Sequence, residues 1–171
     1  MNEHLDLAAL IRADTPLLAI ETHEELEVIA SFQRALTGSL RPLYTWSITT
    51  GLRRLDMDTE PKPMSSGEVL DAIVQTRQKS VFLLLDYSPF LRYVVTLRQL
   101  REIAIRQGVQ PHVVALVGAN LELPKEIDAL AVRFSLSLPN EAELDRIVRE
   151  EASNYSRENA GKRVQIHMGA L

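Results

Sequence analysis

The stretch Leu17–Leu36 reads LLAIETHEELEVIASFQRAL and joins a short apolar run, a polar turn and an amphipathic helical pattern. This order of strand, turn and helix opens many α/β domains, in which the turn holds a phosphate on glycine-rich backbone. Here the turn ETHEE has no glycine and no lysine, and it is rich in carboxylates. The stretch therefore predicts an α/β fold whose first turn is not built to hold a phosphate.

Four further β-rich runs follow this first one along the chain. The runs 80–87 (SVFLLLDY) and 112–119 (HVVALVGA) are nearly continuously apolar, which is typical of parallel strands covered on both faces. The other two are 43–49 (LYTWSIT) and 132–138 (VRFSLSL), and with the first run, 16–22 (PLLAIET), the total is five. Because helical patterns separate the runs, we expect a three-layer α/β domain with a mostly parallel sheet of five strands.

Two capping boxes predict where helices begin. Thr22 with Glu25 forms the first, and Ser65 with Glu68 forms the second. Apolar side chains recur at helical spacing after each box. They are Val28, Ile29, Phe32 and Leu36 after the first, and Val69, Leu70, Ile73 and Val74 after the second.

Other segments complete the expected layout. A helix is predicted from Val94 to Arg106, with its apolar face at Leu97, Leu100, Ile103 and Ala104 and with Gly108 as its C-cap. NLELPKEIDALA leaves room for only a small helix, and Asn140 with Glu143 predicts a last one. The segment 50–66 has two prolines and is the longest polar connection, so we expect a binding or mobile loop there.

Composition limits the class of protein. The chain has 171 residues, 46% of them hydrophobic and 25% charged, which fits one globular domain with a sizeable core. The net charge of −4 argues against a nucleic-acid binder that relies on bulk charge, and the absence of cysteine excludes disulfides and zinc–thiolate sites. No secretory signal or apolar run long enough to span a bilayer is visible, so we expect no membrane association and a cytoplasmic protein.

The domain organisation has one open question. We expect a domain over residues 1–150 and a linker, or the start of a following element, over 151–171, because the polar tail turns apolar just before it stops. The chain is then the first domain of a longer protein. A natural short C-terminus that docks on the core explains the same pattern.

The first turn is the first candidate for a nucleotide site. The side chains of Glu21, Glu24, Glu25 and Glu27 crowd the predicted helix start, where carboxylates complement the helix dipole and occupy the place of an anion. They would repel a triphosphate. A structural helix with favourable N-terminal charges is the main interpretation, and a cryptic nucleotide site is the alternative.

Two polar residues at strand ends are the remaining candidates for nucleotide binding. Asp86 follows an apolar run as a Mg²⁺-binding aspartate does, but Tyr87 stands where a catalytic glutamate usually follows. Asn120 follows the next run, in the position of a polar residue that senses a γ-phosphate. Both residue types are also common turn formers. No catalytic residue and no metal ligand is nominated, since the four histidines lack ligand spacing.

Three arginines suggest an interaction surface. Arg53 and Arg54 follow the second run and Arg92 follows the third, so we expect all three at the carboxyl edge of the sheet, where open α/β sheets bind ligands. A solvated face is one interpretation, and a contact surface for an acidic partner or a neighbouring subunit is the other. Trp46, the sole tryptophan, is predicted to lie in the core.

The segments DLAALIRADTPLLAIETHEE, PLYTWSITTGLRRL, VFLLLDYSPFL and ELPKEID, together with VRFSLSLPNEAELDRIV, carry a resemblance to a known family. Residues from about 5 to 150 resemble the N-terminal region of the AAA-type ATPases of cyanobacteria and algal plastids, the hypothetical chloroplast open-reading-frame type. In that family this region precedes the ATPase module and is similar to a P-loop, RecA-like domain that lacks a working Walker A motif.

The resemblance implies a non-catalytic regulatory or interaction domain that supports ring assembly or recruits a partner. The implied partners are the ATPase module of the same protein, a further copy of the chain and an unidentified protein client. ATP and Mg²⁺ are implied for the full-length family and no cofactor for this chain, which is expected in the cytoplasm or plastid stroma. The alternative function is an ATP-binding or ATP-hydrolysing module with an atypical phosphate site. Single-stranded nucleic acid is a third, less favoured ligand.

Overall fold

The computed structural model describes residues 3–105, 111–136, 145–146, 148–149 and 152–153. The chain divides into two compact units, Met1–Leu136 and Ser137–Leu171, and the fold below is that of the first. Its sheet has six strands in the order β3-β2-β4-β5-β1-β6, and all neighbours are parallel except β2 and β3. The α/β class, the three layers and the mostly parallel sheet are confirmed.

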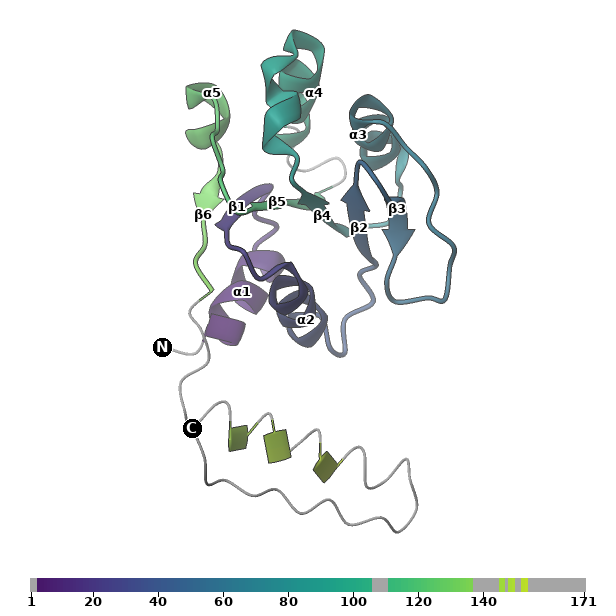
Figure 1. Ribbon diagram of the computed structural model, residues 1–171, viewed down its shortest axis with the longest axis vertical. Helices are drawn as coiled ribbons and strands as arrows, with labels where there is room; N and C mark the ends of the chain where they lie inside the picture. Colours follow the sequence, from purple (N-terminus) through teal and green to yellow (C-terminus); the bar gives the residue numbers. More distant parts are fainter. Residues whose placement is uncertain (1–2, 106–110, 137–144, 147, 150–151, 154–171) are drawn as a thin grey trace. The chain divides into compact units, whose positions relative to one another are not determined.

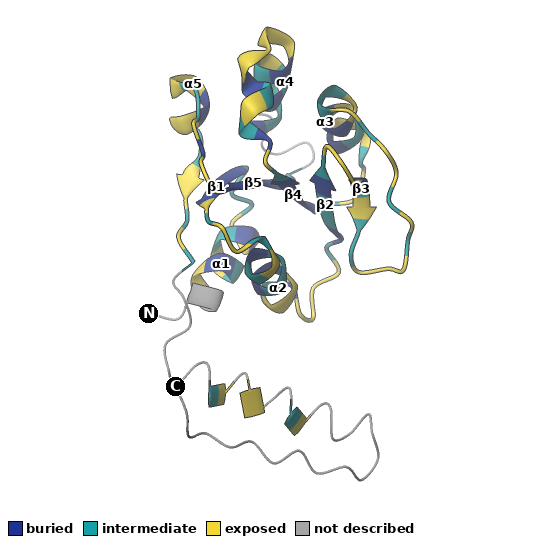
Figure 2. Ribbon diagram, viewed as in Figure 1, coloured by how far each residue is buried: buried dark blue, intermediate teal, exposed yellow. Residues whose placement is uncertain are grey.

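The centre of the sheet consists of the two most apolar strands. β4 (Val81–Leu85) and β5 (Val113–Gly118) pair in parallel, with Val81 opposite Val113, and are buried almost throughout (Figure 2). β1 (Leu17–Glu21) adds to the other side of β5, and β2 (Leu43–Ser47) adds to β4. Parallel strands covered on both faces need apolar side chains on both, which is why these runs do not alternate.

Helices cover both faces of the sheet (Figure 1). α1 (Glu3–Arg12) and α2 (Glu25–Ala35) lie on one face, where Leu7, Phe32 and Leu83 share a buried cluster. α3 (Ser66–Gln75), α4 (Val94–Ile105) and α5 (Lys125–Asp128) lie on the other, around Trp46 and Tyr87. The small α5 and the burial of Trp46 confirm two predictions, whereas α1 was not predicted.

The two predicted capping boxes have different outcomes. At Ser65 the box is confirmed, since the Ser65 hydroxyl accepts from the Glu68 amide and the Glu68 carboxylate accepts from the Ser65 amide. Along α3, Val69, Leu70 and Ile73 are buried as expected. Val74 was expected on the same face but is 46% exposed, because it follows the buried stripe by one residue and so points away from the sheet.

The segment 50–66 is not a plain loop, and the expected count of five strands is one short. β3 (Gly51–Arg54) runs antiparallel to β2, and Leu52 exchanges two backbone hydrogen bonds of 2.8 Å with Lys62. Gly51 has φ +83°, and a Cβ there would lie 2.2 Å from the Lys62 carbonyl oxygen, so only glycine fits this turn. The residues TTG at positions 49–51 follow a strand and are typical of a hairpin turn, so they could have predicted β3.

Other predicted elements end near or beyond the described residues. β6 (Val132–Arg133) is shorter than the run 132–138, although the Phe134 amide still bonds the Ala19 carbonyl at 2.9 Å. Gly108 and the start of the last helix at Asn140 lie outside the described residues. In the second unit, the described residues between 145 and 153 are helical. The expected boundary at residue 150 stays a prediction.

Candidate functional site

The turn after β1 is short and closed by its own backbone. Only residues 22–24 separate β1 from α2. The Thr22 amide donates to the Gly118 carbonyl at 2.9 Å, and the Glu24 amide donates to the Thr22 hydroxyl at 3.0 Å. The predicted capping box of Thr22 and Glu25 is wrong, because Thr22 still pairs with the neighbouring strand and Glu24, not Thr22, is the N-cap.

The carboxylates of this turn lie where a phosphate would be held. Glu24 is exposed and Glu25 half-buried at the first turn of α2, whose N–H groups and dipole attract negative charge. Glu27 is paired with Arg34 at 2.5 Å, and Glu21 lies 3.9 Å from Arg133. The positive end of α2 therefore faces carboxylates of the chain itself.

Asp86 lies at the end of β4 beside the end of β5. It is exposed, has φ +50°, a conformation that aspartate tolerates, and its amide donates to the Val117 carbonyl at 2.8 Å. The next residue, Tyr87, is fully buried against Trp46, and its hydroxyl donates to the Ser66 carbonyl at 2.6 Å. Desolvation raises the pKa of Tyr87. The position of the missing glutamate is thus occupied by a neutral core residue.

Arg92 and Asn120 line one cleft at the carboxyl ends of β4 and β5. This η1 cleft, of about 470 Å³, lies between the 3₁₀ helix η1 (Ser88–Arg92) and residues 120–124. The Ser88 hydroxyl donates to the Asn120 carbonyl at 3.4 Å and links the two sides. Asp86 does not line the cleft. The structure therefore brings Arg92 and Asn120 together but leaves Asp86 outside.

The other two arginines lie elsewhere than expected. Because β3 runs antiparallel to β2, Arg53 lies opposite Thr45 and Arg54 opposite Tyr44, so the strand leads away from the carboxyl edge. The prediction that Arg53 and Arg54 lie at that edge is wrong, and the unpredicted hairpin is the reason. Arg54 donates to both carboxylate oxygens of Asp56, at 2.8 and 2.7 Å.

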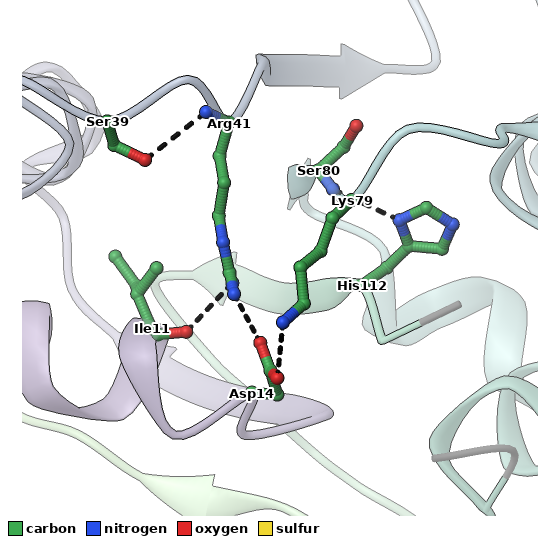
Figure 3. A network of polar contacts seen from close by, with 7 residues as sticks. All are labelled: Ile11, Asp14, Ser39, Arg41, Lys79, Ser80 and His112. Carbon is green, nitrogen blue, oxygen red and sulfur yellow. Dashed lines mark hydrogen bonds and ion pairs between the residues drawn. The ribbon is translucent and has the colours of Figure 1, made fainter. Parts of the chain in front are cut away.

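The opposite, amino edge of the sheet holds a network of charged groups (Figure 3). Asp14, which follows α1 and has φ +56°, pairs with Arg41 before β2 and with Lys79 before β4, the latter at 2.5 Å. Arg41 also donates to the Ile11 carbonyl at 2.8 Å. Burial acts to raise the pKa of Asp14, but hydrogen bonds from Lys79 and Arg41 outweigh it and hold this pKa below its usual value.

His112 joins the same edge from the start of β5. Its Nδ1 accepts from the Ser80 amide at 3.2 Å, and its Nε2 lies 3.0 Å from the Thr76 carbonyl, so the ring is neutral with the proton on Nε2. Desolvation lowers the pKa of His112, and the bond to Thr76 opposes this in part. The ring joins the end of α3 to the starts of β4 and β5.

A hollow of about 440 Å³ also lies at the amino edge, between the end of α2 and the segment after β3. Its two arginines, Arg41 and Arg54, already form ion pairs with Asp14 and Asp56, so their charges are neutralised within the chain.

In the described part of the chain no three His, Asp or Glu side chains group as metal ligands, and no helix is long and apolar enough to cross a membrane. The η1 cleft and its surroundings are the better candidate site.

The turn after β1, the strand order and Asp86 at the end of β4 together correspond to a P-loop domain whose phosphate loop is replaced. The family model described as "SpoVK-like AAA ATPase, N-terminal domain" matches residues 3–136. The chain belongs to this family. The match confirms the resemblance to the N-terminal region of AAA-type ATPases, and it ends where the first compact unit of this SpoVK-like domain ends.

Curated relatives of this SpoVK-like domain are longer proteins. The chain is 24% identical over 143 residues to the uncharacterized AAA domain-containing protein ycf46 of Trieres chinensis, covering 81% of this chain and 29% of that protein. It is also 24% identical over 151 residues to the protein of the same name from Pyropia yezoensis, covering 85% and 30%. The chain thus spans less than a third of the length of these relatives.

Among solved structures, the chain is similar to a chain in the structure of Drosophila ORC bound to DNA. The sequence identity is 13%, the match covers 83% of this chain and 93% of the other, and the TM-score is 0.42.

Exposed apolar residues at the carboxyl edge were missed in the sequence. Leu26 at the start of α2 is 81% exposed, and Val94 and Val95 at the start of α4 are 80% and 70% exposed. The sequence could have predicted the exposure of all three side chains, since each lies off the apolar stripe of its helix. The network around Asp14 had no such signal, because its partners lie 27 and 65 residues away along the chain.

Proposed function

We propose that this chain is a non-catalytic interaction domain of an AAA-type ATPase, which keeps a P-loop-like sheet without a nucleotide site. The observation that carries this proposal is the turn at residues 22–24 between β1 and α2. A Walker loop uses about eight residues, with glycines and a lysine, to surround a phosphate. Three residues, two of whose amides are already bonded within the chain, cannot do so.

The surroundings of Asp86 support the same proposal. A hydrolytic site needs a general base or a water-positioning group beside the Mg²⁺-binding aspartate. Here Tyr87 is fully buried, with its hydroxyl bonded to Ser66. Replacing it with a catalytic side chain would require opening the core around Trp46.

The proposed role concerns protein contacts. The relatives are about three times longer than the matched region, so we propose that this domain contacts the ATPase module of the same protein and helps it to assemble or to recruit a client. ATP and Mg²⁺ would be bound by that module. A cytoplasmic or plastid-stromal location is part of the same proposal.

An ATP-binding module with an atypical site is the second candidate function. The observation that favours it is that Arg92 and Asn120 line one cleft at the end of the sheet where open α/β domains bind ligands. Arg53 and Arg54 do not contribute, since β3 carries them away from this edge. Arg92 shares this cleft with the carboxylate of Glu122, so the cleft offers little positive charge for a triphosphate.

Titration of the chain with ATP and Mg²⁺ by calorimetry tests the proposal, with Asp86→Ala as a second protein. The expected result is no saturable heat at millimolar ATP for either protein. Saturable binding to the wild type that Asp86→Ala abolishes would overturn the proposal. Binding that Arg92→Ala abolishes instead would assign the nucleotide to the η1 cleft and would overturn it as well.

A further inference from the structure

The carboxyl edge of the sheet exposes apolar side chains at two places, each flanked by charge of one sign. At the start of α4, Val94 and Val95 are 80% and 70% exposed and follow Arg92 and Tyr93. We call residues 92–95 the basic corner. Single exposed apolar residues are ordinary, but adjacent ones beside a charged side chain are typical of contact surfaces.

The second place is the start of α2. Leu26 is 81% exposed and follows Glu24 and Glu25, and we call residues 24–26 the acidic corner. The backbone here is fixed by the bond from the Glu24 amide to the Thr22 hydroxyl and by the first helical bond from Val28 to Glu24. The two carboxylates therefore project from a rigid helix start. Rigid elements lose little conformational freedom when they bind.

The guanidinium of Arg92 is already held in position. It donates to the Tyr93 hydroxyl at 3.0 Å and lies 5.0 Å from the centre of the Tyr93 ring. Among the described residues, no carboxylate forms an ion pair with Arg92, whereas the exposed side chains of Arg34, Arg98 and Arg133 all have one. An ordered arginine beside apolar side chains fits a carboxylate on a partner surface.

The two corners are complementary and lie on one edge. They follow β1 and β4, which β5 separates, and they belong to helices on opposite faces of the sheet (Figure 1). Each chain therefore presents an acidic and a basic surface in the same direction. If a two-fold axis relates two copies at this edge, the basic corner of each copy meets the acidic corner of the other. The same contact then forms twice, as an isologous interface requires.

We propose that two copies of this chain pair through their carboxyl edges, with the basic corner of each on the acidic corner of the other. In this pair Arg92 meets Glu24 and Glu25, and Val94 and Val95 cover Leu26. The inference rests on the proposed interaction role and names its partner. The proposed pairing can be wrong while the proposed function is right, because ATP titration tests the proposed function whereas self-association tests the pairing.

Sedimentation of the full 171-residue chain over a range of concentrations tests the pair. The expected species at high concentration has twice the 19.2 kDa of one chain, and it dissociates at high salt because the contacts are charged. Arg92→Glu and the double variant Glu24→Arg/Glu25→Arg should each weaken pairing by about tenfold or more. Arg77→Glu makes the same charge change at an exposed site on the amino edge and should pair as the wild type does.

The decisive sample is an equimolar mixture of Arg92→Glu and Glu24→Arg/Glu25→Arg. In the mixture both contacts are again between opposite charges, so pairing should be about as tight as in the wild type although each variant alone pairs weakly. Circular dichroism on each variant checks that the fold is intact. A wild type that stays monomeric at all concentrations, an Arg92→Glu variant that pairs as tightly as the wild type, or a mixture that pairs no more tightly than either variant alone would overturn the proposal. A wild-type assembly larger than two chains would overturn the two-fold arrangement.

Discussion

At the amino edge of the sheet, charged side chains join segments that lie 27 and 65 residues apart in the chain. At the carboxyl edge, distant segments are joined mainly by neutral groups, such as the Thr22 amide on Gly118 and the Ser88 hydroxyl on Asn120. Asp14 links α1 to the starts of β2 and β4, and His112 links α3 to β4 and β5. At the carboxyl edge Asp86 is exposed, and Arg92 donates to the adjacent Tyr93.

This difference between the two edges suggests that the amino edge contributes mainly to stability and the carboxyl edge mainly to the proposed function. Charged groups bridge distant segments at the amino edge, and we expect the carboxyl edge to tolerate substitution better because its exposed charged side chains do not bridge such segments to the same extent. The proposed function requires such tolerance, because it places an acidic turn where a phosphate loop would lie. Matched substitutions at the two edges test the division.

The largest expected contrast is between two histidines. His112→Ala removes packing against Phe82 and leaves the fully buried Ser80 amide without its acceptor, so we expect a loss of about 3 kcal/mol in the free energy of unfolding. His23→Ala, at the exposed turn of the carboxyl edge, should change it by less than about 0.5 kcal/mol. Urea denaturation measures both. Equal losses would contradict the comparison.

Two aspartates in the left-handed conformation give the next contrast. Asp14→Asn keeps the size and backbone preference but leaves Arg41 and Lys79 without their counter-ion, and we expect a loss of about 2 kcal/mol because these groups are only partly exposed. Asp86→Asn makes the same change at the carboxyl edge and should be neutral within about 0.5 kcal/mol. Denaturation midpoints that fall equally in both variants would show that the two edges do not differ in this way.

The smallest expected effect is a pH dependence that belongs to His112. Since burial lowers the pKa of His112 in the folded chain, the unfolded chain takes up a proton near pH 6.5 and the folded chain takes it up only at lower pH. The contribution of His112 to stability is therefore fully present above pH 6.5 and is lost as the pH falls through the lowered pKa of the folded chain, and the loss between pH 7 and 5.5 should be at most roughly 1 kcal/mol.

Denaturation at several pH values measures this dependence, with His112→Gln and His23→Gln as the matched pair. The fall in stability should be absent from the first variant and kept in the second. The same fall in both variants would assign the proton to another group.

Periodicity and apolar runs were enough to predict the five parallel strands and the helices α2 to α5, because elements such as β4, β5 and α3 carry their burial pattern in the local sequence. The helix α1 was not predicted. The hairpin at Gly51 was missed, and this error alone placed Arg53 and Arg54 at the wrong edge. The partners of Asp14 could not be predicted, since no local pattern encodes a contact between distant turns. The composition of the acidic turn predicted that it holds no phosphate, and this stays a prediction that nucleotide titration tests.

The most direct test of the central claim is a heteronuclear NMR titration of the chain with ATP and Mg²⁺ that follows each backbone amide. The account predicts no saturable shifts at residues 22–25, 86 or 118–120 at millimolar ATP. Saturable shifts grouped at these positions would show that the carboxyl edge holds a nucleotide, and they would contradict the proposal that this domain lacks a nucleotide site and serves protein contacts.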